Sequence, residues 1–107
     1  MSLSQKIKEW IQSPEKFNED EATSFFYQVV SAVAFLHLNN VMHADLKPDN
    51  VIICRESSTL VAKVCDLGTA KQKVSKTLNF SSSTGTLNYL SPEALQGLNY
   101  SFPNDVW

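Results

Sequence analysis

The spacing of apolar residues predicts two helices in the first third of the chain. Apolar side chains recur every three to four positions between residues 3 and 11, and Ser13-Pro14 predicts a break because proline disfavours helix at the residue before it. Asn18 followed by Glu21 is typical of a helix N-terminus. A long helix is then predicted from Glu19 to about Leu38, with apolar residues on more than one face, which favours a deeply buried position.

The large apolar side chains of these helices are the candidate core. The predicted buried stripe of the long helix consists of Ala22, Phe25 or Phe26, Val29, Val33 and Leu36. The aromatic side chains that we also predict as core are Trp10, Trp107 and the Phe25-Phe26 pair.

The middle of the chain predicts a β-hairpin. Residues 51–53 and 60–65 are short β-prone runs, and the polar residues 55–59 predict the turn between them. Residues 69–89 contain few apolar side chains and predict a loop. Ser91 before Pro92 predicts the cap and first position of a short helix. These elements indicate an α+β fold that is mainly helical, with one small hairpin.

Composition excludes several classes of function. The chain has 107 residues, of which 43% are hydrophobic, as expected for one modest domain. Its formal charge of −2 does not support bulk electrostatic binding to nucleic acid or to acidic membranes. No apolar run approaches the ~20 residues of a membrane span, and the first residues lack the apolar region of a signal peptide. Two cysteines, Cys54 and Cys65, make neither a disulfide framework nor a zinc site, so we expect an intracellular, cytoplasmic protein; the oligomeric state stays open.

Polar residues between the long helix and the hairpin form the candidate functional site. Asp45, Lys47 and Asn50 lie within six residues of each other, and Asp66 follows the second predicted strand, next to Gly68. An aspartate can accept a hydroxyl proton, a lysine can neutralise phosphate charge, and asparagine and aspartate oxygens can bind Mg²⁺. Two side chains that can bind magnesium, one on each side of a short hairpin, predict a metal–phosphate site.

The same residues resemble the motifs of eukaryotic protein kinases. Residues 43–50, HADLKPDN, are similar to the catalytic-loop pattern H-R-D-L-K-P-x-N, and residues 66–68, DLG, resemble the magnesium motif D-F-G. Residues 85–93 resemble G-T-x-x-Y-x-A-P-E, and residues 105–107 resemble the D-V-W that opens the helix under the catalytic loop. The resemblance implies the middle of a kinase large lobe over residues 1–107, from the helix after the hinge to the start of the central helix, without the small lobe and the remaining helices.

The resemblance implies a serine/threonine protein kinase that uses ATP and Mg²⁺. Asp45 would orient the substrate hydroxyl and accept its proton, and Lys47 would contact the γ-phosphate as it transfers. Thr86 would meet both side chains and help place the acceptor. Lys47 together with Gly85-Thr86 resembles the serine/threonine-specific branch, so the implied partner is a protein substrate with a Ser or Thr acceptor.

The resemblance also implies the residues that contact nucleotide and metal. Asn50 and Asp66 would hold the two Mg²⁺ ions, and Ile52 would form the floor under the adenine. We expect His43 to pack in the interior rather than act as a base. A buried, inert thiol is preferred over a reactive one for Cys65.

Departures from the family pattern bear on regulation and activity. Ala44 stands where many members have the Arg that pairs with a phosphorylated activation loop, so we expect loop ordering to depend weakly on phosphorylation. Leu67 replaces Phe and is expected to pack in its place. Within residues 1–107 there is no G-x-G-x-x-G loop and no V-A-I-K lysine, so we expect the isolated chain to be inactive. Two groups of loop residues have two interpretations each. Phosphorylation sites or a polar linker are the alternatives for Ser81, Ser82, Ser83 and Thr84. A surface that binds an acidic partner or a solvated face are the alternatives for Lys71, Lys73 and Lys76.

Two other functions are compatible with the sequence. A non-catalytic remnant could keep the kinase interior and act only by protein interaction. A small-molecule phosphotransferase could share the His-x-Asp and Asn arrangement, although Lys47-Pro48 and the motif at residues 85–93 favour a protein substrate.

Overall fold

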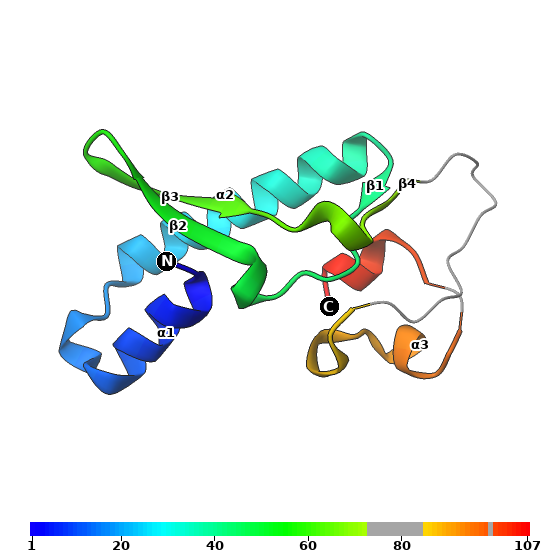
Figure 1. Ribbon diagram of the computed structural model, residues 1–107, viewed down its shortest axis with the longest axis horizontal. Helices are drawn as coiled ribbons and strands as arrows, with labels where there is room; N and C mark the ends of the chain where they lie inside the picture. The colour runs from blue at the N-terminus through cyan, green and yellow to red at the C-terminus, as the bar shows by residue number, and fades with distance from the viewer. Residues whose placement is uncertain (73–84, 99) are drawn as a thin grey trace. The chain divides into compact units, whose positions relative to one another are not determined.

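The computed structural model describes residues 1–72, 85–98 and 100–107, which form two compact units (Figure 1). The first unit contains residues 1–32 and 48–65, and the second contains residues 33–47 and 66–107. The predicted features that lie outside the described residues are Lys73, Lys76, Ser81, Ser82, Ser83 and Thr84. The fold is α+β, as predicted: helices account for most of the regular structure, and the strands form two small antiparallel sheets.

The two helices at the start of the first unit both begin with a side-chain cap, and the cap of the second is the one that the sequence predicts. Helix α1 (Leu3–Gln12) begins at Ser2, whose hydroxyl accepts from the Gln5 N–H at 3.2 Å while the Gln5 side chain accepts from the Ser2 N–H at 2.8 Å. Helix α2 (Glu19–Leu38) begins after Asn18, whose side-chain oxygen accepts from the Glu21 N–H at 3.0 Å. The predicted bounds of both helices are therefore confirmed to within one or two residues.

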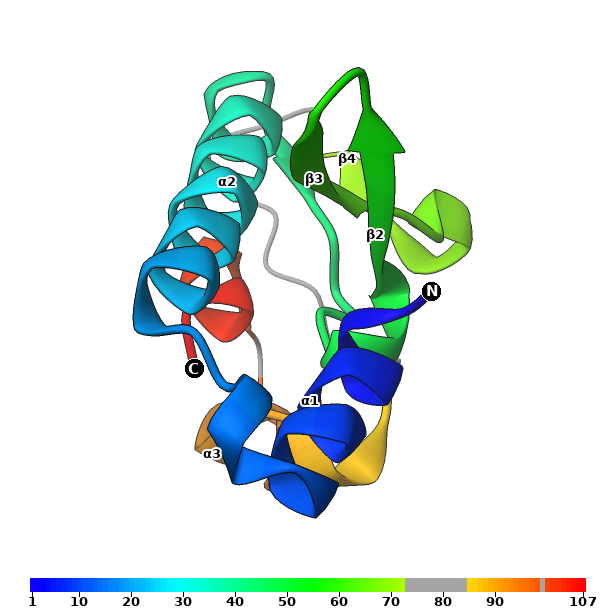
Figure 2. The ribbon, with the colours of Figure 1, turned by 90° about the vertical axis from the view of Figure 1, so that its left-hand side faces the viewer.

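The predicted hairpin is confirmed in the first unit. Strands β2 (Val51–Glu56) and β3 (Thr59–Val64) pair antiparallel over six residues each. The start of the chain adds a short contact to β2, because the Ile53 N–H donates to the Met1 carbonyl at 2.7 Å and Ser2 forms a bridge with Ile52. Figures 1 and 2 show this first segment beside β2.

An ion pair lies on the exposed surface of the hairpin. Lys63 on β3 donates to the carboxylate of Glu56 on β2, and both side chains are more than half exposed. This hydrogen bond and the charge of Glu56 raise the pKa of the Lys63 ammonium group. A raised lysine pKa means that the stabilisation is complete below the ordinary lysine pKa and is lost as the pH rises through the folded-state value. Solvent keeps its contribution small.

The core of the first unit lies between the two helices and the hairpin. Its members are Phe25, Val51, Ile53 and Ala62, with Leu3, Trp10, Val29, Leu60 and Val64 packed against them. The Gln28 side chain also joins α2 to β3, because its oxygen accepts from the Ala62 N–H at 2.8 Å. Trp10 and Phe25 are thus core, as predicted. The prediction is wrong for Phe26, which is 70% exposed, because consecutive helical residues point about 100° apart and cannot share one stripe.

The second unit contains a small sheet that the sequence did not predict. Strand β1 (Val41–Met42) pairs antiparallel with β4 (Lys71–Gln72). Two residues per strand are too few to show the alternation from which a strand is predicted. The loop predicted over residues 69–89 therefore contains a strand at its beginning.

The core of the second unit is built from residues far apart in the sequence. Its members are Met42, Ala44, Ala94 and Tyr100, with Leu90 and Phe102 packed against them. Ser91 caps the short helix α3 (Pro92–Leu95), as predicted. Two predictions are wrong here, since Trp107 is 73% exposed and Leu67 is 52% exposed instead of being packed.

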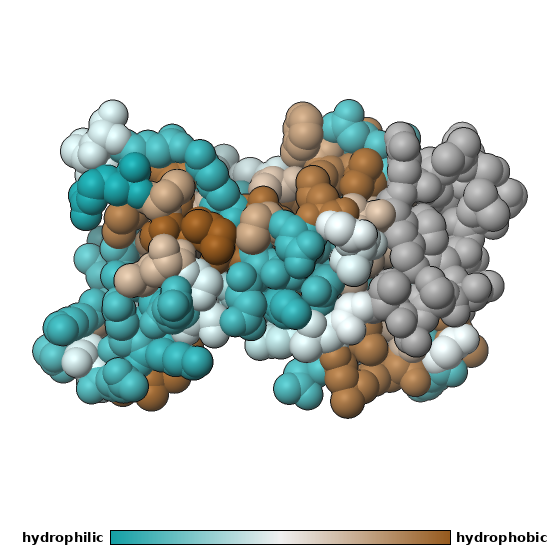
Figure 3. Space-filling model, in the orientation of Figure 1, coloured by the Kyte–Doolittle hydropathy of each residue, from teal (hydrophilic) through white to brown (hydrophobic). Residues whose placement is uncertain are grey.

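Helix α2 presents a second apolar face that the described residues do not cover. The exposed large side chains on this helix are Phe26, Tyr27, Val30, Phe35 and Leu38. Figure 3 shows that hydrophobic side chains reach the surface in several places on one face of the structure. None of the helices in the described residues combines the length and the apolar character that crossing a membrane requires.

Candidate active site

The backbone of residues 43 and 44 is held by one buried carboxylate. The N–H groups of His43 and Ala44 each donate to Asp105 at 2.9 Å, one to each carboxylate oxygen. His37, near the end of α2, lies on the other side of Asp105, with 2.8 Å between its Nε2 and the Asp105 Oδ2. A buried carboxylate with three polar contacts has a fixed orientation, so it fixes the loop that binds to it.

This loop adopts an uncommon backbone conformation at Ala44, next to the candidate base. Ala44 has a φ of +70°, a left-handed backbone that is uncommon outside glycine. The side chain of Ala44 is buried in the core of the second unit, while the carboxylate of Asp45 stays 12% exposed. His43 is fully buried, and its Nδ1 is 3.2 Å from the Asp45 N–H, so it supports the loop structurally, as predicted.

Gly85 brings a second segment close to the loop. A Cβ atom at this position would lie 2.7 Å from the Ala44 carbonyl oxygen, and Gly85 has a φ of +113°. Both observations require glycine here, because a side chain would collide with the backbone and strain its own. The close approach places the following residue, Thr86, next to Asp45.

Asp45, Lys47 and Thr86 form a connected cluster in the second unit. The Thr86 hydroxyl donates to Asp45 Oδ1 at 2.8 Å, and it accepts a hydrogen bond from the Lys47 ammonium group. The Lys47 nitrogen also lies 3.3 Å from Asp45 Oδ2. A carboxylate, an ammonium group and a hydroxyl thus meet at one point, and both charged side chains remain partly exposed. This arrangement can accept a proton and neutralise an anion at the same place.

A whole-chain comparison decides the family. A model of the protein kinase domain matches residues 1–107. The chain belongs to the protein kinase family. Proteins of this family use ATP and Mg²⁺ in phosphoryl transfer, which is the chemistry that this cluster of charges suits.

The curated relatives of this chain are named as kinases, several of them as serine/threonine-protein kinases. It is 35% identical over 96 residues to the serine/threonine-protein kinase Nek9 of Xenopus laevis, covering 90% of the chain and 10% of that protein. It is 36% identical over 104 residues to the inhibitor of nuclear factor kappa-B kinase subunit alpha of Danio rerio, covering 94% of the chain and 14% of that protein. It is 36% identical over 91 residues to the serine/threonine-protein kinase PLK4 of Drosophila melanogaster, covering 85% of the chain and 11% of that protein. The chain thus spans about a tenth of the length of these relatives.

The remaining predicted site residues lie in both units of this kinase chain. Asn50 ends a short 3₁₀ turn in the first unit, where it is buried and its carbonyl accepts from the Cys65 N–H at 2.9 Å. Ile52 follows on β2 and is 37% exposed. Asp66 belongs to the second unit, with a φ of +61°, and its carboxylate accepts from the Gly68 N–H at 3.4 Å.

The donor chemistry of Asn50 and Asp66 fits magnesium. An amide oxygen and an exposed carboxylate are hard ligands, and Mg²⁺ is held in kinases by one or two protein side chains together with phosphate oxygens and water. Within the described residues there is no group of three or more His, Cys, Asp or Glu side chains that could hold a metal ion. Each of these two side chains therefore has an oxygen of the kind that binds Mg²⁺.

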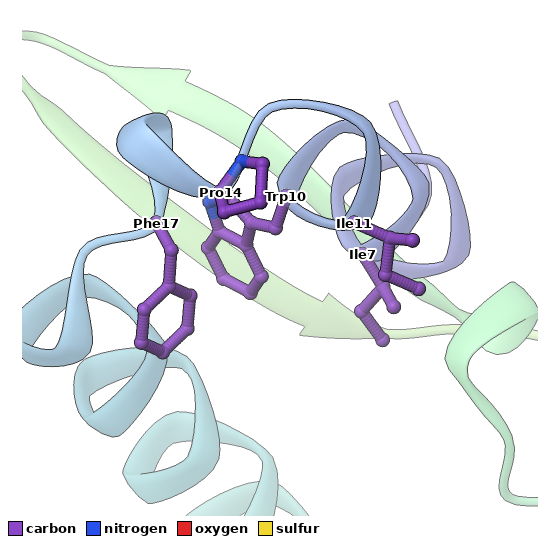
Figure 4. A pocket seen from close by; sticks show the side chains of 5 residues that line it. All are labelled: Ile7, Trp10, Ile11, Pro14 and Phe17. Carbon is purple, nitrogen blue, oxygen red and sulfur yellow. The ribbon is translucent and has the colours of Figure 1, made fainter.

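A hollow on the first unit lacks groups for this chemistry. It has a volume of about 380 Å³ and is lined by Ile7, Trp10, Ile11, Pro14 and Phe17 (Figure 4). None of these five side chains can bind a metal ion or neutralise a phosphate group. The hollow is therefore distinct in character from the cluster around Asp45.

Sequence reasoning did not find the residues that support the site from a distance. Asp105 was noted only within its motif, and the contact of His37 with it was not predicted. These residues are 68 positions apart, and a single sequence contains no signal that pairs them. The signal that marked Asp105 was the series of four motifs, which follow one another in the order of the family and at plausible spacing.

We expect Asp105→Ala to destabilise the full-length protein by about 3–5 kcal/mol, because it leaves two buried N–H groups and His37 without their acceptor. Urea denaturation followed by fluorescence measures this loss. Asp49→Ala is the matched control, since Asp49 is exposed, and its midpoint should stay close to that of the wild type. Equal midpoints for the two variants would contradict the supporting role of Asp105.

Proposed function

We propose that this chain supplies the catalytic part of a serine/threonine protein kinase, which transfers the γ-phosphate of ATP to a hydroxyl group of a protein. The observation that carries the proposal is the cluster of Asp45, Lys47 and Thr86 on a chain of the protein kinase family. Its three side chains come from two segments about forty residues apart, and Gly85 is required for their approach.

In the proposed reaction, Asp45 binds the acceptor hydroxyl and receives its proton. The hydroxyl oxygen forms a bond to the γ-phosphorus, the bond from that phosphorus to the β–γ bridging oxygen breaks, and ADP leaves with the electron pair. Lys47 stabilises the negative charge of the transferring group, because its ammonium group lies 3.3 Å from the base. Thr86 orients the Asp45 carboxylate through its 2.8 Å hydrogen bond, so the acceptor hydroxyl can reach the carboxylate from one direction only.

The nucleotide and metal contacts in this proposal are made by four residues. Asn50 and Asp66 would hold Mg²⁺, which neutralises phosphate charge when bound. Ile52 would lie under the adenine, since its apolar side chain is partly exposed on β2. Lys47 would contact the γ-phosphate. The support for Lys47, Asn50 and Asp66 is their residue types at the matching positions of the family motifs, and Ile52 is assigned from its place on β2, two residues after Asn50.

Specificity for serine and threonine rests on two features. Lys47 and the Gly85-Thr86 pair match the serine/threonine-specific pattern, and two of the relatives described above are named serine/threonine-protein kinases. The Lys47 contact with Thr86 is consistent with this branch, because the pair lies beside the base where the acceptor would bind.

Phosphorylation of peptide arrays by the full-length protein tests the proposal. Arrays with Ser, Thr or Tyr as the acceptor should be labelled at Ser or Thr from ATP and Mg²⁺, and Asp45→Asn should remove the label. Labelling only at Tyr would contradict the proposed specificity. Transfer only to small alcohols would favour a small-molecule phosphotransferase, and no transfer would favour a protein that acts by interaction alone.

A further inference from the structure

Ser91 and Asn104 form a buried polar bridge in the second unit. The Ser91 hydroxyl donates to the Asn104 side-chain oxygen at 2.7 Å, and the Ser91 N–H reaches the same oxygen at 3.4 Å. Ser91 is 1% exposed and Asn104 is 7% exposed. A short hydrogen bond between two buried neutral groups fixes both segments, because a buried polar group that loses its partner is costly.

The bridge depends on a departure from the kinase pattern. Ser91 stands where the motif G-T-x-x-Y-x-A-P-E has alanine. Alanine has no hydroxyl and could not make the 2.7 Å contact with Asn104. The pair is therefore a feature of this chain beyond the motif by which the family is identified.

The bridge completes a closed ring of hydrogen bonds and chain segments that includes the catalytic base. Asp45 binds Thr86, and five residues later in the chain Ser91 binds Asn104. Asn104 is joined covalently to Asp105, whose carboxylate accepts from the N–H groups that precede Asp45. Asp45, Thr86 and Asn104 also line one small cavity of about 10 Å³, which leaves room for about one water molecule at most.

From this closed ring of contacts we infer that Ser91 and Asn104 are positioning residues for the acceptor. Together they hold the segment from Thr86 to Leu90 at a fixed distance from Asp45, so that the acceptor binds where the base can take its proton. The inference rests on the proposed kinase function for its catalytic consequence. The structural coupling between Ser91 and the loop at residues 43 and 44, which Asp105 holds, does not depend on that function.

The first test is amide hydrogen exchange in the full-length protein without nucleotide. Ser91→Ala should accelerate exchange at the His43 and Ala44 amides by about 10-fold, because a lost buried hydrogen bond favours local opening by about that factor. Ser101→Ala is the matched control, since Ser101 makes no capping hydrogen bond with its side chain and lies in the same unit. Unchanged exchange at His43 and Ala44 in Ser91→Ala would overturn the inference, whether or not the protein is active.

The second test separates positioning from stability. Ser91→Ala should raise the KM for a peptide substrate about fivefold and leave the KM for ATP within about twofold. In the double variant Ser91→Ala/Asn104→Leu neither side chain of the pair is left as an unpaired polar group, so the melting temperature should recover part of the loss. The rest of the loss stays, because the N–H groups of residue 91 and Ala94 no longer have the acceptors that Asn104 and Ser91 supplied. The peptide KM should stay raised in this double variant. Recovery of the peptide KM together with the melting temperature would overturn the positioning role.

These measurements distinguish the failure of the inference from the failure of the proposed function. A wild-type protein that transfers no phosphate to any peptide contradicts the proposed function, and hydrogen exchange then still decides whether the bridge is coupled to the loop. An active wild-type protein with an unaffected Ser91→Ala variant contradicts the inference alone.

Discussion

In the full-length protein, Asp45→Asn is expected to lower the turnover number by about 10²–10⁴-fold while the affinity for Mg–ATP changes by less than about twofold. Asparagine keeps the shape of the side chain and can still accept from Thr86, but it cannot take the proton of the acceptor hydroxyl. Steady-state kinetics with a peptide substrate measures the turnover number, and titration calorimetry measures the affinity for nucleotide.

Asp66→Ala is expected to lower the affinity for Mg–ATP. It removes a proposed magnesium ligand, so it should abolish both measurable Mg–ATP binding and transfer. Asp49→Asn serves as the matched control for both variants, because Asp49 is an exposed carboxylate close to the cluster in sequence and outside the proposed machinery. An equal loss of nucleotide affinity in Asp45→Asn and Asp66→Ala would contradict the division of roles between base and metal ligand.

Most of the local structure follows from short-range patterns. The cap of α2 could be predicted because the cap, the residue it binds and the first apolar positions lie within one turn. The hairpin could be predicted because two β-prone runs flank a polar turn. By contrast, the pairing of β1 with β4 joins residues about thirty positions apart, and the two-residue strands contain no pattern of their own.

The site could be predicted in its residues and only partly in its geometry. The motif residues Asp45, Lys47 and Thr86 were identified from the sequence, and the structure brings these three together. The resemblance implies that Asp105 lies under the catalytic loop, but the hydrogen bonds of its carboxylate could not be predicted, because they depend on the folded backbone of residues 43 and 44. The Ser91–Asn104 bridge was missed for a similar reason, since serine before a helix is ordinarily explained as a cap alone.

Burial was the property that sequence predicted least well. Phe25 and Phe26 are equally apolar, and only the direction of each side chain on α2 decides that one is core and the other exposed. Trp107 was expected to be core from its size, yet nothing in the described residues covers it. Hydrophobicity shows that a side chain gains from burial, and it does not identify the surface that buries it.

The isolated 107-residue chain is expected to transfer no phosphate at a useful rate. It contains the cluster around Asp45, but residues 1–107 include neither the glycine-rich loop nor the lysine that would align the γ-phosphate in this family. A misplacement of ~1 Å can cost about 100-fold in rate, so binding without this alignment is not sufficient. Incorporation of labelled phosphate into a generic protein acceptor measures the activity, and we expect none above that of the Asp45→Asn variant.

The packing of the isolated chain should also be loose, because α2 exposes a face of large apolar side chains. Phe26, Tyr27 and Phe35 on this helix are each about 70% exposed. Exposed apolar surface of this kind favours association and a loosely packed state. We therefore expect a broad thermal transition, binding of a hydrophobic dye and concentration-dependent association in sedimentation. The triple variant Phe26→Ser/Tyr27→Ser/Phe35→Ser should reduce dye binding and association. A monomeric chain that melts sharply, phosphorylates the acceptor and loses that activity in Asp45→Asn would show that these 107 residues are sufficient for catalysis.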